Sequence, residues 1–361
     1  MINLPSKYRS VKTVAGFVVA TLCVMLASCD ATIHFYPEPD EPDKGRSKIR
    51  LNVDWSGYGK TVPTGMTVIC HHTESGEMRQ SIDNNTSFVT PYLAPGRHWA
   101  MVFNLTEDEF GCIRFRGLES AETAEAYLPE LNGSKWYEKR DGSRDYMAGQ
   151  PEWLAVDTIM TDPVEPFFGT ETKVIGTLHP RNIIYTLHVT VWTENIGNVK
   201  MVRGAISGMA SGRRFASDRP NDNFVTVTHL IESGSWSRTR TSSDPNDGFV
   251  KADIRCFGLP GNHGGRPEEN TLEFRAMLAD GKTVLKYIIP VGDLIRENEA
   301  PPECRGDNLD LYLTVRLDPP VPPVDGDGDG DGDGDWGFDV DVEDWEETDD
   351  VIVPLNTLMY E

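Results

Sequence analysis

The sequence predicts an all-β protein of two tandem antiparallel β-sandwiches, followed by a flexible acidic tail. Apolar and polar residues alternate in many short segments, whereas no long segment repeats its apolar residues with the 3.6-residue period of a helix. Pro and Gly separate these segments, as expected where a chain turns between strands. The length of 361 residues is enough for two domains that each bury a core.

The N-terminus carries export and attachment signals. Three basic residues precede an apolar run from Val14 to Leu26, and Leu-Ala-Ser then leads into Cys29, which resembles a bacterial lipobox. We expect residues 1–28 to be a lipoprotein signal peptide and Cys29 to carry the acyl chains, such as palmitate, that hold the protein to the outer membrane. The alternative is an uncleaved membrane anchor, for which the apolar run is short. The Pro- and acid-rich residues 29–46 predict an extended tether.

Strand patterns fill residues 47–162, the first predicted sandwich. Apolar residues alternate with polar ones from Ile49 to Trp55, which is typical of a half-buried strand. We place the boundary of this domain after Asp162, where Pro163 and Pro166 break the pattern. Further β-rich runs lie at residues 66–70, 98–103, 110–115 and 153–159.

Residues 163–320 form the second predicted sandwich, and its alternation is clearer. Apolar residues recur at every second position in 183–191, 250–256 and 309–317. Asp280-Gly281 predicts a tight hairpin, because this dipeptide favours the backbone of a two-residue turn. The hairpin would join strands at 272–278 and 283–289.

The acid is concentrated near the C-terminus. Between Asp325 and Asp350 there are 14 carboxylates and no Lys or Arg. Residues 321–337 therefore predict a Pro and Gly-Asp linker that self-repulsion extends. Residues 338–361 contain apolar residues that disordered acidic tails usually lack, including a short run from Val351 to Leu355, and they predict a strand that docks on a sheet edge of its own or of another chain. The residues expected to dock are Phe338, Val340, Val342 and Trp345.

Charge and motifs exclude several functions. The formal net charge of −23 argues against nucleic acid as a partner, because phosphate binding depends on Lys and Arg. No nucleophile elbow, phosphate-binding loop or zinc-protease motif is present, so we expect no enzyme, cofactor or metal site. The Gly-Asp run resembles the front of a calcium loop, but no register that supplies its aspartates places a Glu at the twelfth position. Weak, nonspecific binding of divalent ions stays open.

Four cysteines follow the lipidation site, two in each predicted domain. An exported protein can pair Cys70 with Cys112 and Cys256 with Cys304, and the alternative is buried free thiols. The tripeptide Asp-Thr-Ile fits a short O-glycosylation pattern of Bacteroidetes secreted proteins, which would modify Thr158.

Several motifs together carry a family resemblance: the lipobox, Leu51-Asn-Val-Asp-Trp55, Gly65-Met66, the turn Leu93-Ala-Pro-Gly96, Ala205-Ile-Ser-Gly-Met-Ala210 and the Gly-Asp linker. They resemble a family of Bacteroidales fimbrial anchor and accessory lipoproteins, related to the fimbrillins. That resemblance implies two transthyretin-like, Greek-key sandwiches and a lipidated N-terminus. In related shaft subunits a protease removes the N-terminal strand and a neighbour's strand fills the groove; near the first strand here, the basic residues are Lys44, Arg46 and Lys48.

The predicted function is therefore that of a non-enzymatic lipoprotein, exposed at the base of a fimbrium. Its partners would be the outer membrane, through Cys29, and fimbrial shaft subunits, which it would bind by β-strand complementation. The alternative is a surface glycan- or ligand-binding lipoprotein, in which Trp136, Tyr137 and Trp236 form a stacking platform. A third hypothesis is a calcium-responsive adhesion protein that senses the ion through its Gly-Asp run.

Overall fold

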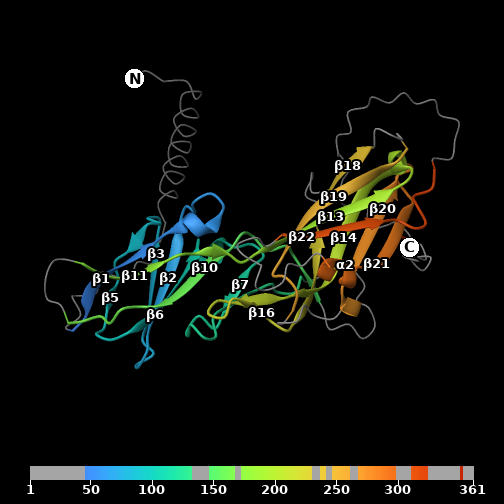
Figure 1. Cartoon of the computed structure of the whole chain (residues 1–361). Coiled ribbons are helices and arrows are strands. Elements are labelled where there is room, and N and C mark those ends of the chain that lie inside the picture. The colour runs from blue at the N-terminus through green and yellow to red at the C-terminus, as the bar shows by residue number, and fades with distance from the viewer. Residues whose placement is uncertain are drawn as a thin grey trace, which may run out of the picture. The chain divides into compact units, whose positions relative to one another are not determined.

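The computed structural model describes residues 45–131, 146–166, 172–229, 236–240, 246–260, 267–297, 310–323 and 350–352. Strands in antiparallel-rich sheets make up most of these residues, so the all-β prediction is confirmed (Figure 1). Within these ranges, no helix has the length and apolar character needed to cross a bilayer.

The first sandwich packs two sheets against each other. One has the strand order β11–β1–β4, with β5 paired to the start of β1, and the other has the order β12–β10–β6–β2–β3. Most of these strands group together in Figure 1. Their bounds are β1 Ser47–Val53, β2 Met66–His72, β3 Met78–Asp83, β4 Phe88–Val89, β5 Tyr92–Leu93, β6 His98–Asn104, β10 Ala155–Met160, β11 Lys173–Leu178 and β12 Arg181–Asn182.

The predicted alternation of the first strand is confirmed. Ile49, Leu51 and Val53 of β1 are buried between the two sheets, whereas Lys48 is exposed. The 3-10 helix η1 (Trp55–Tyr58) follows at once, and the side chain of Asp54 caps it by accepting a hydrogen bond from the Ser56 N–H.

The predicted domain boundary does not coincide with a change in strand pairing. Strands β11 and β12 both follow residue 162, yet β11 pairs in parallel with β1 and β12 pairs with β10 of the first sandwich. The prolines after Asp162 interrupt a connection inside this sandwich, where Val164 bridges back to Gly96. A break in the local pattern marks a loop, and strand pairing between distant segments decides the sandwich to which the next strand belongs.

The second sandwich also has two sheets. Their strand orders are β18–β19–β13–β22 and β23–β21–β20–β14–β17–β9. The predicted hairpin at Asp280-Gly281 joins β20 to β21, with Gly281 at a φ of 69°. The bounds are β9 Tyr146–Ala148, β13 Tyr185–Thr193, β14 Val199–Ala210, β17 Phe224–His229, β18 Trp236–Arg240, β19 Gly248–Cys256, β20 Thr271–Leu278, β21 Val284–Pro290, β22 Asp310–Arg316 and β23 Asp350–Ile352; the helix α2 spans Gly292–Glu297.

A smaller sheet is shared by the two halves of the chain. Its order is β16–β15–β8–β7, in which β7 (Arg114–Arg116) and β8 (Glu125–Tyr127) come from the first half and β15 (Gly212–Arg214) and β16 (Arg219–Pro220) from the second. Strand β9 crosses in the same way and pairs in parallel with β17. The two sandwiches are thus joined by backbone hydrogen bonds as well as by side chains.

The shared sheet explains why β2 and β6 are buried on both faces. All seven residues of β2 are buried, because one face packs on the sheet of β1 and the other joins the larger core of the second half. On that second face Phe103 stacks on Phe115 at 4.6 Å between ring centroids, and Phe215 lies 6.1 Å from Phe115. We expected strands with one polar face, and this part of the sandwich departs from that expectation.

Candidate functional site

Two strands of this fold occupy positions that a strand from another molecule could also take. The first is β1, an inner strand with neighbours on both sides. Backbone hydrogen bonds also join β1 to the adjoining loops. The Ile49 N–H donates to the carbonyl of Pro91 (3.1 Å), and the Val53 N–H donates to the carbonyl of Ser87 (2.9 Å). Leu51 is fully buried. The position of β1 is therefore a groove defined by hydrogen bonds along both edges and by apolar side chains on its inner face.

The second is β23, which the tail contributes to the edge of the six-stranded sheet. It pairs in parallel with β21, with residues 350–352 in register with Val284, Leu285 and Lys286. This strand lies within residues 338–361, the segment expected to dock, whereas Phe338, Val340, Val342 and Trp345 lie outside the described residues, so their docking stays a prediction. The sequence signal for β23 is the β-branched run that begins at Val351.

A row of buried cations lies next to this edge. Arg203 of β14, Arg275 of β20 and Lys286 of β21 are directly opposite one another in the ladder, and each is only 7–8% exposed. Glu273 accepts a hydrogen bond from Arg275 Nε at 2.8 Å, and its other oxygen lies 3.8 Å from Lys286 Nζ. Since like charges in one row repel, this face favours an acidic neighbour, and the carboxylates of the tail precede β23 directly.

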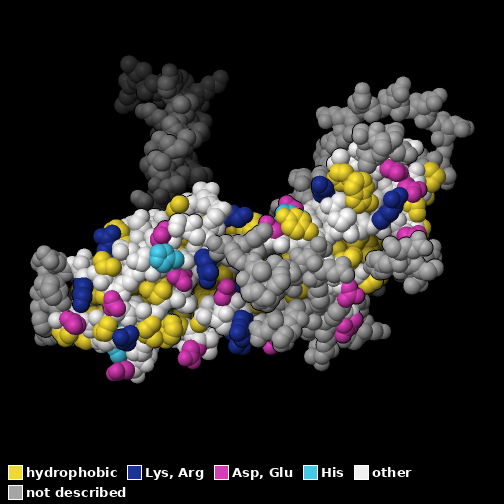
Figure 2. Space-filling view, viewed as in Figure 1, with side chains coloured by type: hydrophobic (Ala, Val, Ile, Leu, Met, Phe, Trp, Pro, Cys, Tyr) yellow, Lys and Arg dark blue, Asp and Glu magenta, His cyan; other side chains and the backbone are white. Residues whose placement is uncertain are grey.

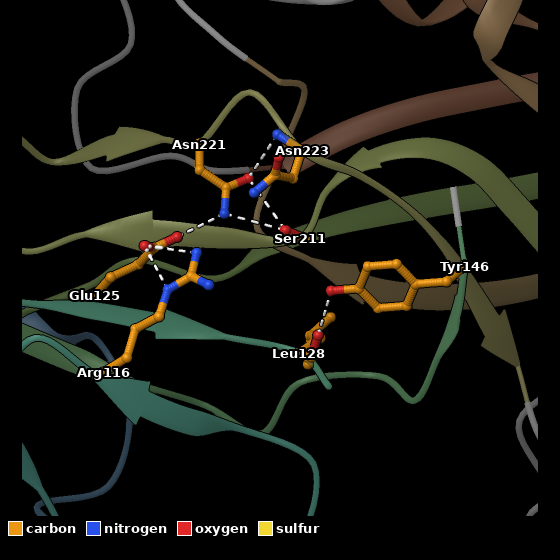
Figure 3. Close-up of polar contacts among 7 residues, drawn as sticks. All are labelled: Arg116, Glu125, Leu128, Tyr146, Ser211, Asn221 and Asn223. Carbon is orange, nitrogen blue, oxygen red and sulfur yellow. Dashed lines mark hydrogen bonds and ion pairs between the residues drawn. The ribbon is translucent and has the colours of Figure 1, made fainter. Parts of the chain in front are cut away.

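A polar cluster with a buried centre holds the shared sheet together (Figure 3). The Glu125 carboxylate accepts hydrogen bonds from Arg116 Nε (2.9 Å) and from Asn221 Nδ2 (2.5 Å). Asn221 also donates to Ser211 Oγ at 3.0 Å and accepts from the Asn223 N–H at 3.1 Å. Glu125 and Arg116 belong to the first half and the other three residues to the second, so the cluster ties the two halves by charge-assisted hydrogen bonds.

Tyr146 closes the cluster from the side of β9. Its hydroxyl donates to the carbonyl oxygen of Leu128 at 2.6 Å, and the Leu128 N–H in turn donates to the carbonyl of Ser211 at 2.8 Å (Figure 3). Burial raises the pKa of Tyr146 above its usual value, so the phenol remains a neutral donor. No simple motif in the sequence signals this arrangement.

The described cysteines do not form the first predicted disulfide. Cys70 carries a free thiol in the core of the first sandwich, whereas Cys112 packs against the larger core on the other side of the sheet. Burial raises the pKa of Cys70 to about 12. Cys256 is also a buried free thiol, and its pKa rises to about 11 because of burial. Of the two alternatives, buried thiols therefore describe Cys70 and Cys256, and Cys304 lies outside the described residues.

The remaining predicted sites are only partly described. Thr158 lies half-buried on β10, and its N–H donates to Asp157 Oδ1 at 2.8 Å. For Trp236 the structure describes only the backbone, within β18. Within the described ranges, no three His, Cys, Asp or Glu side chains approach one another closely enough to hold a metal ion. Cys29, Trp136 and Tyr137 lie outside the described residues.

The described surface carries both signs of charge. On the face shown in Figure 2, basic and acidic side chains are interspersed and the apolar side chains form small groups. The described residues of this face thus present a mixed charge pattern.

The sequence matches a known protein family. A family model described as a domain of unknown function, DUF5119, matches residues 41–229, which is more than half of the chain. The chain belongs to the DUF5119 family. The matched region runs from the tether to the end of β17. It therefore contains the first sandwich and the shared sheet.

The relationship of this DUF5119 protein to a fimbrium anchoring subunit supports the resemblance that the motifs predicted. The inferred fimbrium anchoring subunit Fim4B of Bacteroides ovatus is 26% identical over 198 residues, which is 50% of this chain and 55% of that protein. The match thus spans about half the length of this relative. An inferred adhesin of the same species, known from a crystal structure, is 20% identical over 79% of this chain and 97% of its own, with a TM-score of 0.50. The fimbrial anchor protein Mfa2 of Porphyromonas gingivalis is 12% identical over 75% of this chain and 90% of its own, with a TM-score of 0.43.

Proposed function

We propose that this DUF5119 protein is a non-enzymatic lipoprotein of the cell surface that anchors a fimbrium or serves as its accessory subunit. Acyl chains on Cys29 would hold it to the outer membrane, and the shaft subunits of the fimbrium would be its partners. The relationship to Fim4B, a protein inferred to anchor a fimbrium, supports this role.

The mechanism we propose is β-strand complementation, and the pairing of β23 with β21 is the observation that supports it most directly. The N–H and C=O groups on the free side of β21 attract a strand from any source, because an unpaired sheet edge is a template for pairing. In one form of this mechanism, β23 pairs with β21 until a strand of the partner displaces it. In the other form, β23 dissociates from β21 and adds itself as a strand to a sheet of the partner. The cation row beside β21 favours the acidic tail in the first state.

The groove of β1 is the second place for complementation. Replacing β1 would expose Ile49, Leu51 and Val53, at a cost of about 6 kcal/mol for the three side chains together. An incoming strand would have to restore this burial as well as the hydrogen bonds on both edges. Arg46, one of the basic residues near β1, forms an ion pair with Glu77 at 2.5 Å, so a protease that recognises Arg46 would first have to break this pair.

The experiment that tests the tail uses the affinity-tagged full chain in the native host. Val351→Pro removes a backbone N–H within β23, and Thr357→Pro is the matched control beyond it. We expect Val351→Pro to speed amide exchange at Val284–Lys286 and to change the recovery of shaft subunits, with the control behaving as the wild type. Deletion of residues 325–361 with unchanged recovery of shaft subunits would contradict the role of the tail.

The anchor is tested separately. Cys29→Ala should abolish incorporation of labelled palmitate and release the protein from the outer-membrane fraction, while Cys23→Ala, which removes the other cysteine near the N-terminus, should leave both unchanged. Palmitate incorporation that survives Cys29→Ala would refute lipidation at this residue.

A further inference from the structure

A polar pocket of about 360 Å³ lies where the first sandwich meets the second. Its wall comes from η1, β10 and β12 on one side and from the starts of β13 and β22 and the β15–β16 turn on the other. This volume is at the lower end of the range for small-molecule sites. The shared sheet joins the two halves by backbone hydrogen bonds, and Arg213 of its strand β15 lines the pocket.

The carboxylates in this wall already have partners. Asp157 accepts hydrogen bonds from the N–H groups of Thr158 (2.8 Å) and His179 (2.6 Å), one on each oxygen. Asp218 accepts from Arg213 Nε at 2.8 Å. The third carboxylate, Asp310, lies 3.5 Å from His188 Nε2. The acceptors of the wall are therefore largely used by the protein itself.

The donors have capacity left. Lys60 and Arg181 are exposed, and the Lys60 ammonium lies over the ring of Trp153, 3.8 Å from its centroid. Arg213 is 5% exposed, and its buried Nη1 has no hydrogen-bond partner among the described residues. Thr158 and Thr186, which carry hydroxyl groups, also line the pocket. A wall with satisfied acceptors and unused cationic donors favours an anionic oxygen ligand.

We propose that this pocket binds an acidic monosaccharide unit, with the carboxylate of a uronic acid between Arg181 and Lys60 and the sugar hydroxyls toward Thr158 and Thr186. The guanidinium of Arg181 can pair with a carboxylate through two hydrogen bonds, and Lys60 supplies a point charge. The mostly polar wall suits a polyhydroxylated ring better than an apolar ligand. Lys60 covers a face of Trp153, so recognition would rest on hydrogen bonds rather than on stacking. This binding activity is independent of the proposed fimbrial role.

Calorimetric titration of the full chain with glucuronic acid tests the proposal, with glucose as the neutral control. Arg181→Gln and Lys60→Gln should each weaken glucuronic acid binding about tenfold or more, the loss expected for one charge-assisted hydrogen bond. Lys282→Gln, which removes an exposed lysine in the β20–β21 turn, should leave the affinity unchanged. Unchanged melting temperatures would show that the variants fold, and amide shifts at Thr158 and Thr186 on titration would place the ligand.

Three outcomes would overturn the proposal. The first is an absence of binding at about 10 mM glucuronic acid, or glucose bound equally well. The second is inorganic phosphate binding as tightly as glucuronic acid, which would reduce the pocket to a bare oxyanion site. The third is a mass increase on Thr158 in protein from the native host, because a covalent glycan would then occupy the pocket. Loss of fimbrial subunits from the purified protein without loss of glucuronic acid binding would refute the anchor role alone.

Discussion

Asn221→Ala is the substitution that should most clearly show how much the hydrogen bonds of the shared sheet stabilise the fold. Asn221 is 8% exposed and joins Glu125 of the first half to Ser211 of the second. Removing its side-chain amide takes one of two side-chain hydrogen-bond donors from the buried Glu125 carboxylate, which costs about 1.5–3 kcal/mol, and also removes the weaker bonds to the Ser211 hydroxyl and the Asn223 N–H, together about 1 kcal/mol. We therefore expect the free energy of unfolding to fall by roughly 2–4 kcal/mol.

Urea denaturation followed by tryptophan fluorescence measures this loss. Asp222→Ala is the matched control, since Asp222 is the exposed neighbour of Asn221 and its removal should change stability by less than about 0.5 kcal/mol. A double-mutant cycle with Glu125→Ala should give a coupling energy of about 1 kcal/mol or more. The reasoning is refuted if Asn221→Ala and Asp222→Ala lose the same amount, or if the cycle shows no coupling.

Three further outcomes follow from the packing. Gly212→Ala should lower stability by about 1–3 kcal/mol, because the new Cβ would lie 2.5 Å from the carbonyl oxygen of Ala126, whereas Gly65→Ala, with its nearest atom at 3.5 Å, should cost less; thermal melts compare them. His98 is 2% exposed, and burial together with the neighbouring His72 lowers its pKa from 6.5 to about 4. Below pH 6.5 the unfolded chain binds a proton at His98 that the native protein does not bind, so the free energy of unfolding falls by up to about 3 kcal/mol as the pH is lowered to 4. The urea midpoint of the wild type should therefore fall more between pH 7.5 and pH 4.5 than that of His98→Gln. An equal fall in both proteins would contradict this role of His98. Cys70, with its pKa raised to about 12, should react with a thiol reagent at pH 8 only after denaturant is added, and mass spectrometry showing rapid labelling in the native protein would be evidence against its burial.

The strands with strict alternation could be predicted from the sequence. In β1, β13, β19 and β22, apolar residues occupy every second position, and the structure buries those residues on one face. The hairpin at Asp280-Gly281 could also be predicted, because the conformation of a turn depends on residues that are adjacent in the sequence. These features are set by neighbours in the chain, and the sequence contains that information directly.

Features that depend on distant segments could not be predicted in this way. The pairing of β8 with β15 brings Ala126 opposite Arg213, and neither segment signals the other. The same holds for the pocket, whose wall draws Lys60, Arg181 and Asp310 from three well-separated parts of the chain. For the tail, periodicity and the apolar run from Val351 predicted a strand within residues 338–361, but neither feature indicated that the partner would be the distant edge strand β21.

The crossing of β8 and β9 into the second half has a consequence for how this chain reaches its native state. The first half cannot bury the outer face of β2 and β6 until β15 and β17, at residues 212–229, are available. Contacts between segments so far apart in sequence close large loops and slow folding. We expect that a fragment ending at residue 162 would expose Phe103 and Phe115 and lack β11 and β12, and would therefore aggregate instead of folding alone. We therefore expect the two halves to unfold in a single cooperative transition.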